Sequence, residues 1–387
     1  MAIAILRMTS SFDNLPNSNT SNTDMAANST SRIFLAFLFG LFFIDVHVAA
    51  QDSNRIHLQL DSSEAEAVLS ILDKRAAGTA PTDDDWKRLF ETEPYVRLKK
   101  REAAMHRDFT DDNFKKFVLS PELAARASIL RQTLDKWKHA DIQASARRVL
   151  DYLPEQAMIK AKVFPMIKPV TNSFVFESET NPAIFLYLDP EESAAKFENT
   201  VAHELHHIGY ASVSSLANEK QKDVPANAKP AVEWMGAFGE GFAMLAAAGG
   251  PDVHPHAASS PQEHARWDHD LANFNTDLGA LQQFFLDVID QKLTTKEKIN
   301  ERAYSFFGDA QGAWYTVGYK MAVIVEKRFG RKVLIDCMLD PRELLARYNQ
   351  AATEINERDP KRLALWSPDL LQKIHTPPVV SAPNTGY

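Results

Sequence analysis

The sequence predicts a mainly α-helical fold with a small β-sheet, an α+β arrangement, and three observations support this prediction. Apolar residues recur with helical spacing through residues 82–153 and through most of the chain after residue 231. Between these stretches, residues 158–188 hold short β-rich runs separated by prolines and turn residues. A capped helix follows the last of these runs directly. We therefore expect this helix to pack on a short sheet, with helical parts before and after it in the chain.

The first fifty residues are typical of a signal peptide. Residues 33–44 are almost wholly apolar, and Val48-Ala49-Ala50 supplies the small residues that a signal peptidase requires. Met25 is an alternative start of the chain. A membrane anchor is the competing interpretation, but Asp45 ends the apolar run well short of the ~20 residues that a bilayer requires. We expect residues 1–50 to be removed on export, which gives a periplasmic or secreted protein with no stable membrane span.

The composition is that of a globular protein and excludes several classes. The chain has 387 residues, of which 45% are hydrophobic, and a formal net charge of -8. An acidic chain lacks the basic surface that binds nucleic acid, so we expect no nucleic-acid partner. The single cysteine, Cys337, excludes an intramolecular disulfide and a thiolate metal cluster, and its apolar neighbours predict a position in the core. Nothing in the composition indicates an oligomeric state.

Residues 51–155 are predicted to form a helical N-terminal part that opens with a strand at residues 56–60. The pair Thr82 and Asp85 has the spacing of a capping box at the start of a helix. Prolines at the first position are typical of helices, and Pro121 begins another one here.

The β-rich runs at 158–167, 174–176 and 184–188 are predicted to form the sheet, and the next helix extends from Ser193 to about Tyr210. Four apolar residues of this helix share one face, and the histidines at 203 and 207 lie near the opposite face. These four are Phe197, Val201, Leu205 and Ile208. One face can thus cover the sheet while the other borders a cleft.

The chain after Tyr210 is predicted to be a polar linker up to Pro230, followed by a helix over residues 231–248 and a loop over residues 251–268. Further helices are expected at 271–289, 296–307, 313–329 and 341–354. The proline-containing tail, residues 376–387, is expected to be disordered.

The chemistry is concentrated in His203-Glu204-Leu205-His206-His207. Residues four apart lie about one helical turn from each other, so His203 and His207 project from one face and can share one metal ion. Glu204 points roughly 100° away, beside the metal, where a general base takes a proton from water. The competing interpretation is a pair of surface histidines satisfied by hydrogen bonds.

A catalytic zinc requires a third protein ligand and one open position. Glu240, on the next helix, is the leading candidate, because the small residues around it would let the two helices approach closely. These small residues are Gly236, Ala237, Ala243 and Ala247. Glu233 lies nearly on the same face and is the alternative ligand or a partner of a ligating imidazole.

The pairing of His203–His207 with Glu240-Gly241-Phe242-Ala243 resembles the gluzincin metallopeptidases. The spacing is longer than in the aminopeptidases of that group, and the chain more closely resembles uncharacterised bacterial families described as zinc-dependent peptidases. The resemblance implies Zn²⁺ as cofactor and a peptide or protein as substrate. Residues 156–375 would form the catalytic part.

Tyr315-Thr316-Val317-Gly318 is similar to the gluzincin segment whose tyrosine hydroxyl stabilises the tetrahedral intermediate. The resemblance therefore implies a catalytic role for Tyr315, since the developing oxyanion needs a donor. Tyr319, one turn further along, is the substitute. The alternative is that both tyrosines are aromatic core residues.

The remaining histidines are expected to be structural or exposed. His206 occupies the variable position of the motif and should face elsewhere. Four others surround the 251–268 loop, where they are exposed residues or form a second metal or substrate site. These are His254, His256, His264 and His269.

The sequence thus predicts a zinc-dependent hydrolase, in first place a peptidase, with Glu204 as general base. Two other functions stay open. One is a non-catalytic helical binding protein whose histidine motif is incidental or stores metal, and the other is a zinc hydrolase of a non-peptide amide. The strand at 183–188 could bind an extended peptide by strand addition.

Overall fold

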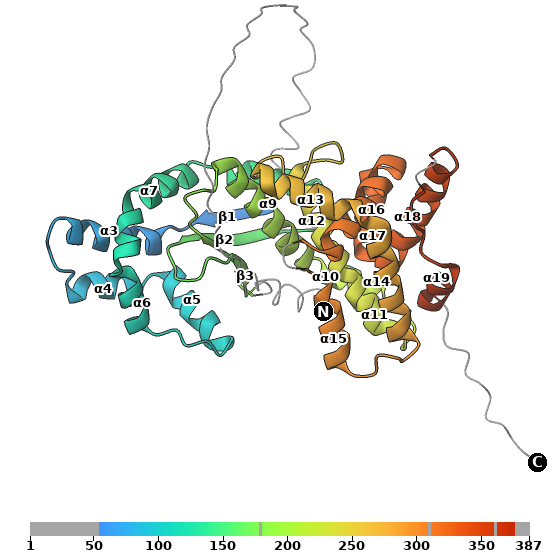
Figure 1. The fold of residues 1–387 in the computed structure, drawn as a ribbon, viewed down its shortest axis with the longest axis horizontal. Coiled ribbons are helices and arrows are strands. Elements are labelled where there is room, and N and C mark those ends of the chain that lie inside the picture. Colours follow the sequence, from blue (N-terminus) through green and yellow to red (C-terminus); the bar gives the residue numbers. More distant parts are fainter. Residues whose placement is uncertain (1–53, 178–179, 309–310, 360–361, 376–387) are drawn as a thin grey trace, which may run out of the picture.

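The computed structural model describes residues 54–177, 180–308, 311–359 and 362–375. Within them the fold is mainly helical with a four-stranded sheet, which confirms the predicted α+β class. Figure 1 shows an elongated molecule with the N-terminal helices at one end, the C-terminal helices at the other, and the sheet between them. The expected signal peptide and the expected disordered tail lie outside the described residues. The boundary proposed at residue 155 stays a prediction.

The N-terminal part begins with the predicted strand, β1 (Ile56–Leu60), and continues as helices. The capping box is present, because the Thr82 hydroxyl accepts a hydrogen bond from the backbone N–H of Asp85 and the Asp85 carboxylate accepts one from that of Thr82. The helices are α3 (Ser63–Ala76), α4 (Asp83–Phe90), α5 (Glu93–Ala104), α6 (Asp111–Val118), α7 (Pro121–Lys138) and α8 (Ile142–Leu150).

The sheet has the strand order β1-β2-β4-β3, with β2 (Ile159–Met166), β3 (Phe174–Phe176) and β4 (Ala183–Tyr187) at the predicted places. The first three strands in this order are parallel, and β3 is antiparallel to β4. The strand predicted at 183–188 was expected to be free to pair with a peptide. This expectation is wrong, because β4 already pairs with β2 on one side and with β3 on the other.

The two faces of the sheet contact different helices, because side chains alternate along a strand. Val163 and Ile184 belong to the main core, to which α8 and α9 (Ala194–Ala211) contribute. Phe164 and Phe185 belong to a separate cluster that includes Leu98 of α5. The helix that carries the histidine motif therefore rests on a rigid, doubly covered sheet.

Three predictions for the chain after α9 need correction. The expected linker contains α10 (Ser214–Lys220), a short helix that tertiary contacts stabilise: Ala217 is buried, and the amide of Gln221 donates to the carbonyl of Leu339. Such a short helix is marginal by itself, which is why the sequence did not indicate it.

The helix expected over residues 231–248 is two helices joined by a 3₁₀ turn. They are α11 (Lys229–Met235) and α12 (Gly239–Ala248), with η1 (Gly236–Phe238) between them. Glycines at both ends of the turn weaken the continuous helix. Gly249, at φ 88°, ends α12 as expected.

The loop expected over residues 251–268 ends earlier, because α13 (Pro261–Ala272) begins with a capping box formed by Ser260 and Glu263. Two short helices that the sequence did not indicate, α17 and α19, complete the C-terminal part. Its elements are α14 (Phe274–Ile289), α15 (Lys296–Ser305), α16 (Ala313–Phe329), α17 (Arg331–Leu339), α18 (Pro341–Asn356) and α19 (Pro368–His375).

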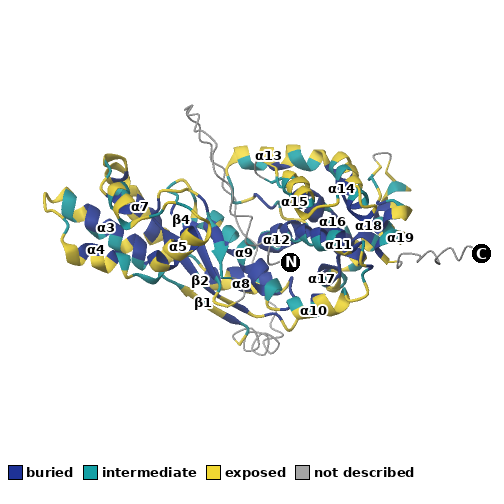
Figure 2. Cartoon of the chain, turned by 90° about the horizontal axis from the view of Figure 1, so that it is seen from below, coloured by how far each residue is buried: buried dark blue, intermediate teal, exposed yellow. Residues whose placement is uncertain are grey.

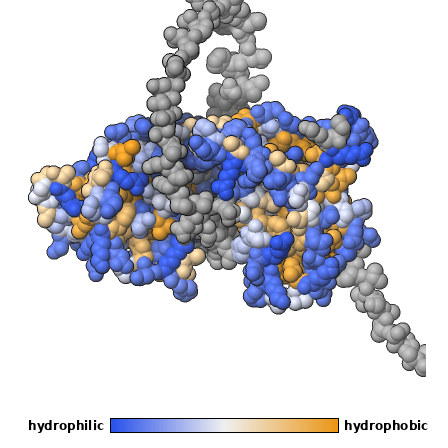
Figure 3. All heavy atoms as spheres, viewed as in Figure 1, coloured by the Kyte–Doolittle hydropathy of each residue, from blue (hydrophilic) through white to orange (hydrophobic). Residues whose placement is uncertain are grey.

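The core extends through the centre of the molecule, where α12 and α16 are mostly buried in Figure 2. The face in Figure 3 is mainly hydrophilic, with small apolar patches at both ends of the molecule. Among the described residues, none of the helices has both the length and the apolar composition needed to span a membrane.

Candidate metal centre

The helix α9 presents the histidine motif because its N-terminus and one of its faces are fixed. The Ser193 hydroxyl accepts a hydrogen bond from the backbone N–H of Lys196 at 3.1 Å, which caps the helix. Phe197, Val201 and Leu205 are fully buried on the predicted face. The opposite face then carries the imidazoles, as the 3.6-residue period requires.

Glu240 reaches the same place from α12, which lies against both α9 and α16. Ala243 and Ala247 are fully buried, in agreement with the prediction that small residues allow close approach of the helices. On its other side, α12 approaches α16 at Gly241, where the two backbones touch. Glu240 itself is only 4% exposed.

The structure brings His203, His207 and Glu240 together into a nearly equilateral triangle of donor atoms. The Nε2 atoms of the two histidines are 3.1 Å apart, and each lies 3.2 Å from Oε2 of Glu240. Each residue thus offers one ligand atom to a common point.

The size of this triangle fits a zinc ion. Nitrogen and oxygen ligands bind zinc at about 2.0–2.1 Å, so two ligands of a tetrahedral zinc are about 3.3 Å apart. The observed edges of 3.1 and 3.2 Å agree with that value. Two imidazoles and one carboxylate are also the ligand types found in catalytic zinc sites with an open fourth position.

Electrostatics inside the triangle favour a positive charge between the three groups. Burial would raise the pKa of Glu240, but the charge of His207 and hydrogen bonds from both histidines outweigh it and hold that pKa well below its usual range. Burial would lower the pKa of His207, and the charge and hydrogen bond of Glu240 raise it instead. The site therefore suits a cation, and protons compete with the metal for it.

Glu204 lies beside the triangle and does not join it. Its side chain is half-buried, and burial raises the pKa of its carboxyl, with a further increase from the charge of Glu240 and a partial decrease from the two histidines. A carboxyl group whose pKa is moved towards neutrality is suited to accept a proton and return it.

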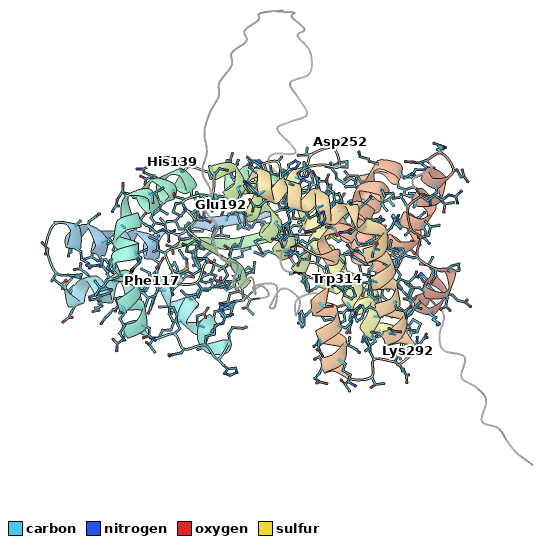
Figure 4. The ribbon with its side chains drawn as sticks, in the orientation of Figure 1. Phe117, His139, Glu192, Asp252, Lys292 and Trp314 are labelled. Atoms are coloured by element: carbon cyan, nitrogen blue, oxygen red, sulfur yellow. The ribbon has the colours of Figure 1, made fainter. Side chains whose placement is uncertain are left out.

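Tyr315 lies at the site, and Tyr319 does not. The Tyr315 ring is nearly parallel to that of His203, with centroids 6.2 Å apart and an interplanar angle of 18°. Burial, the charges of Glu240 and Glu204, and a hydrogen bond to Glu240 raise the pKa of its hydroxyl well above the usual value. The Tyr319 hydroxyl instead donates to the backbone carbonyl of Val253 at 3.4 Å. Figure 4 labels Trp314, the neighbour of Tyr315 on α16.

Glu233, the alternative ligand, is half-buried on α11 and lines a surface groove with Lys229. It is not part of a cluster of possible metal ligands among the described residues. The break at η1 explains why Glu240 reaches the histidines and Glu233 does not, because it places the two glutamates on different helices.

The histidines of the 251–268 region form a second cluster, His254, His264 and Asp268. The rings of His254 and His264 are stacked with centroids 3.5 Å apart, so their lone pairs do not converge. His254 Nδ1 also accepts a hydrogen bond from a backbone N–H, which leaves the proton of the neutral ring on Nε2, facing Asp268. These three side chains therefore form a hydrogen-bonded group. His256, expected to be exposed, is buried at 8% exposure.

His206 is 1% exposed, as its expected structural role requires, and burial lowers its pKa well below the usual value. One feature of the site was not predicted from the sequence. The contact between Gly241 and Gly318 holds the helices of Glu240 and Tyr315 together. Gly241, directly after Glu240, was the signal in the sequence that this helix packs closely on another.

A family model matches residues 86–357, which is more than half of the chain and includes every residue of the triangle. The chain belongs to the DUF5700 family. Its description is "putative zinc dependent peptidase", which confirms Zn²⁺ as the predicted cofactor and implies a peptide or protein substrate. No curated protein and no solved structure matches the chain.

Proposed function

We propose that this protein is a gluzincin-type metallopeptidase in which His203, His207 and Glu240 hold zinc. The observation that supports the proposal best is the triangle of donor atoms with edges of 3.1–3.2 Å. Zinc bound there supplies a Lewis acid and lowers the pKa of water towards neutrality.

The side chains around the triangle account for the remaining steps. Glu204 accepts a proton from the attacking water and returns it to the leaving amine, a role that its raised pKa supports. The Tyr315 hydroxyl stays protonated because its pKa is raised, and it donates a hydrogen bond to the oxyanion that forms from the scissile carbonyl. Burial of Glu240 places its carboxylate in surroundings of low dielectric constant, where its charge acts more strongly on the neighbouring groups.

The experiment combines zinc analysis with peptide hydrolysis. Purified protein should contain about one zinc per chain and cleave peptides from a mixed library. Glu204→Gln should keep its zinc and lose roughly 10²–10⁴-fold in kcat. Glu240→Gln should lose zinc affinity, whereas Glu233→Gln, a matched change of a half-buried glutamate on the preceding helix, should keep it.

The outcomes separate the competing functions. Full activity of Glu204→Gln would remove Glu204 as the base. If the protein contains zinc but hydrolyses no peptide and no small amide, the results would favour a non-catalytic protein that binds or stores metal. Hydrolysis of small amides alone would favour the non-peptide hydrolase.

Export is the second part of the proposal. The apolar run at 33–44 and the small residues before Gln51 support a cleaved signal peptide and a periplasmic or secreted enzyme. A single free cysteine is compatible with that location, since no disulfide network is needed.

A further inference from the structure

A cavity lies directly beside two of the proposed zinc ligands, His207 and Glu240. It is enclosed by the C-terminal half of α9, the residues around η1, the start of α12, and helices α17 and α18. Its volume is about 40 Å³, and on this measure one water needs roughly 10–15 Å³. The cavity therefore has room for about three waters, or for one apolar side chain that fills the space of those waters.

The wall of the cavity is largely apolar. The side chains that form it are buried, so the space is shielded from bulk water on several sides. The principal ones are Phe238, Phe242, Met338 and Leu344. An apolar wall favours an apolar occupant, as in most ligand pockets of proteins.

Two of the residues that line the cavity are glycines, which have no side chain to fill the space. A Cβ built on Gly236 or on Gly239 would meet nothing within 4 Å, although both residues line the cavity. Their φ angles of -56° and -52° are ordinary helical values that any residue adopts. Backbone strain therefore does not require glycine here, and the two positions enlarge the space beside the metal ligands.

His206 supplies one polar group to this wall. It is 1% exposed, and its ring hydrogen-bonds to the backbone of Tyr152.

A surface groove lies next to the cavity. This groove has a volume of about 610 Å³, lies along α10 and α11, and shares Tyr210, Gly236 and Pro341 with the cavity. Its outer part is polar and includes Lys222 and Glu233. Gly236 therefore lies where the groove and the cavity adjoin.

We propose that the cavity is the subsite for one apolar side chain of the substrate, of the size of leucine or methionine, and that Gly236 is a specificity-determining residue. The groove would hold the adjoining polar backbone of the peptide. This inference rests on the proposed function, because a side chain in the cavity brings its own peptide bond towards His207 and Glu240.

The first test narrows the cavity at Gly236. The wild type should cleave a peptide with leucine at the variable position at least about tenfold better in kcat/KM than its alanine counterpart. Gly236→Leu should reduce this preference to about threefold or less. Gly279→Leu is the matched control, since Gly279 lies exposed on α14 and its Cβ also meets nothing within 4 Å.

The second test does not depend on hydrolysis. N-acetyl-leucinamide should bind the wild type and the Gly279 variant in saturation-transfer NMR, and its signal should disappear in Gly236→Leu, whereas N-acetyl-glycinamide should bind none of them. If peptides are cleaved but neither the leucine preference nor probe binding changes in Gly236→Leu, the subsite is wrong and the proposed function stands. If the probe binds as expected but no peptide is cleaved, the peptidase is wrong and the cavity remains a binding site.

Discussion

Gly241 and Gly318 lie in direct backbone contact where α12 crosses α16. A Cβ on Gly241 would lie 2.3 Å from the carbonyl carbon of Gly318 and 2.0 Å from the backbone nitrogen of Tyr319. A Cβ on Gly318 would lie 2.7 Å from the carbonyl oxygen of Phe238. Because these atoms belong to backbone, a side chain can be accommodated only if the helices separate. This contact fixes the distance between the helices of Glu240 and Tyr315.

Gly241→Ala should therefore weaken the metal centre as well as the fold. Separation of the helices is expected to destabilise the protein by about 1–3 kcal/mol or more, the usual range for overpacking. It should also move Glu240 and lower zinc affinity. Urea unfolding and competitive zinc titration measure both effects, with Gly279→Ala as the control, which should be neutral or slightly stabilising. Wild-type stability and zinc affinity in Gly241→Ala would contradict this account of the contact.

Tyr315→Phe should reduce kcat far more than it raises KM. If the hydroxyl stabilises the oxyanion, its removal is expected to cost roughly 10²–10³-fold in kcat while zinc stays bound. Tyr319→Phe is the matched control, because its hydroxyl contacts only a backbone carbonyl in the loop before α13. Steady-state kinetics measure kcat and KM of both variants, and zinc analysis measures their metal content. Tyr315→Phe could instead lose zinc while the molecules that still hold zinc keep the wild-type kcat. That result would mean that the hydroxyl only positions Glu240.

Glu64, in α3, should make the stability of the protein pH-dependent. Its carboxylate is fully buried, one oxygen accepts a hydrogen bond from the backbone N–H of Ile167, and the other has no partner. Burial raises the pKa to about 8, against the smaller effects of that hydrogen bond and the charge of Lys168. The folded state thus keeps a proton that the unfolded chain releases above its ordinary pKa of 4.5.

The sign follows from this difference in bound protons. The contribution of Glu64 to stability is fully present below pH 4.5, decreases as the pH rises to about 8, and is constant above that value. The total change is on the order of a few kcal/mol, at about 1.4 kcal/mol per pKa unit. Glu64→Gln should remove most of the decrease in urea-unfolding free energy between pH 5.5 and 8, and Glu66→Gln, on the exposed side of the same helix, should not. A decrease of equal size in wild type and Glu64→Gln would show that other groups cause it.

The mature protein should begin at Gln51. Intact-mass and N-terminal analysis of the protein exported from its host should show that residues 1–50 are absent. Replacing Ala50 by a bulky residue should block the cleavage, because signal peptidases require a small side chain there. An exported protein that retains residues 33–44 would instead indicate a membrane anchor.

Local features of the structure were predictable because they depend on near neighbours in the chain. The caps at Thr82 and Ser193 and the one-turn spacing of His203 and His207 follow from helix geometry alone. The strands were recognisable from their β-rich runs between turns. The capping box at Ser260 is equally local, although it lies in a region where histidines and prolines favour the prediction of a loop.

The sequence by itself determined the α+β class, the pair of histidines one helical turn apart and the neighbouring carboxylate, because each depends on the period of a single element. Only the tertiary structure decided that Glu240 and not Glu233 joins the histidines, that Tyr315 and not Tyr319 lies beside them, and that β4 is internal. Those choices depend on how separate helices and strands pack, through the turn at η1 and the crossing of α12 and α16. Contacts of this kind join residues far apart in the chain, and no periodicity within one element encodes them.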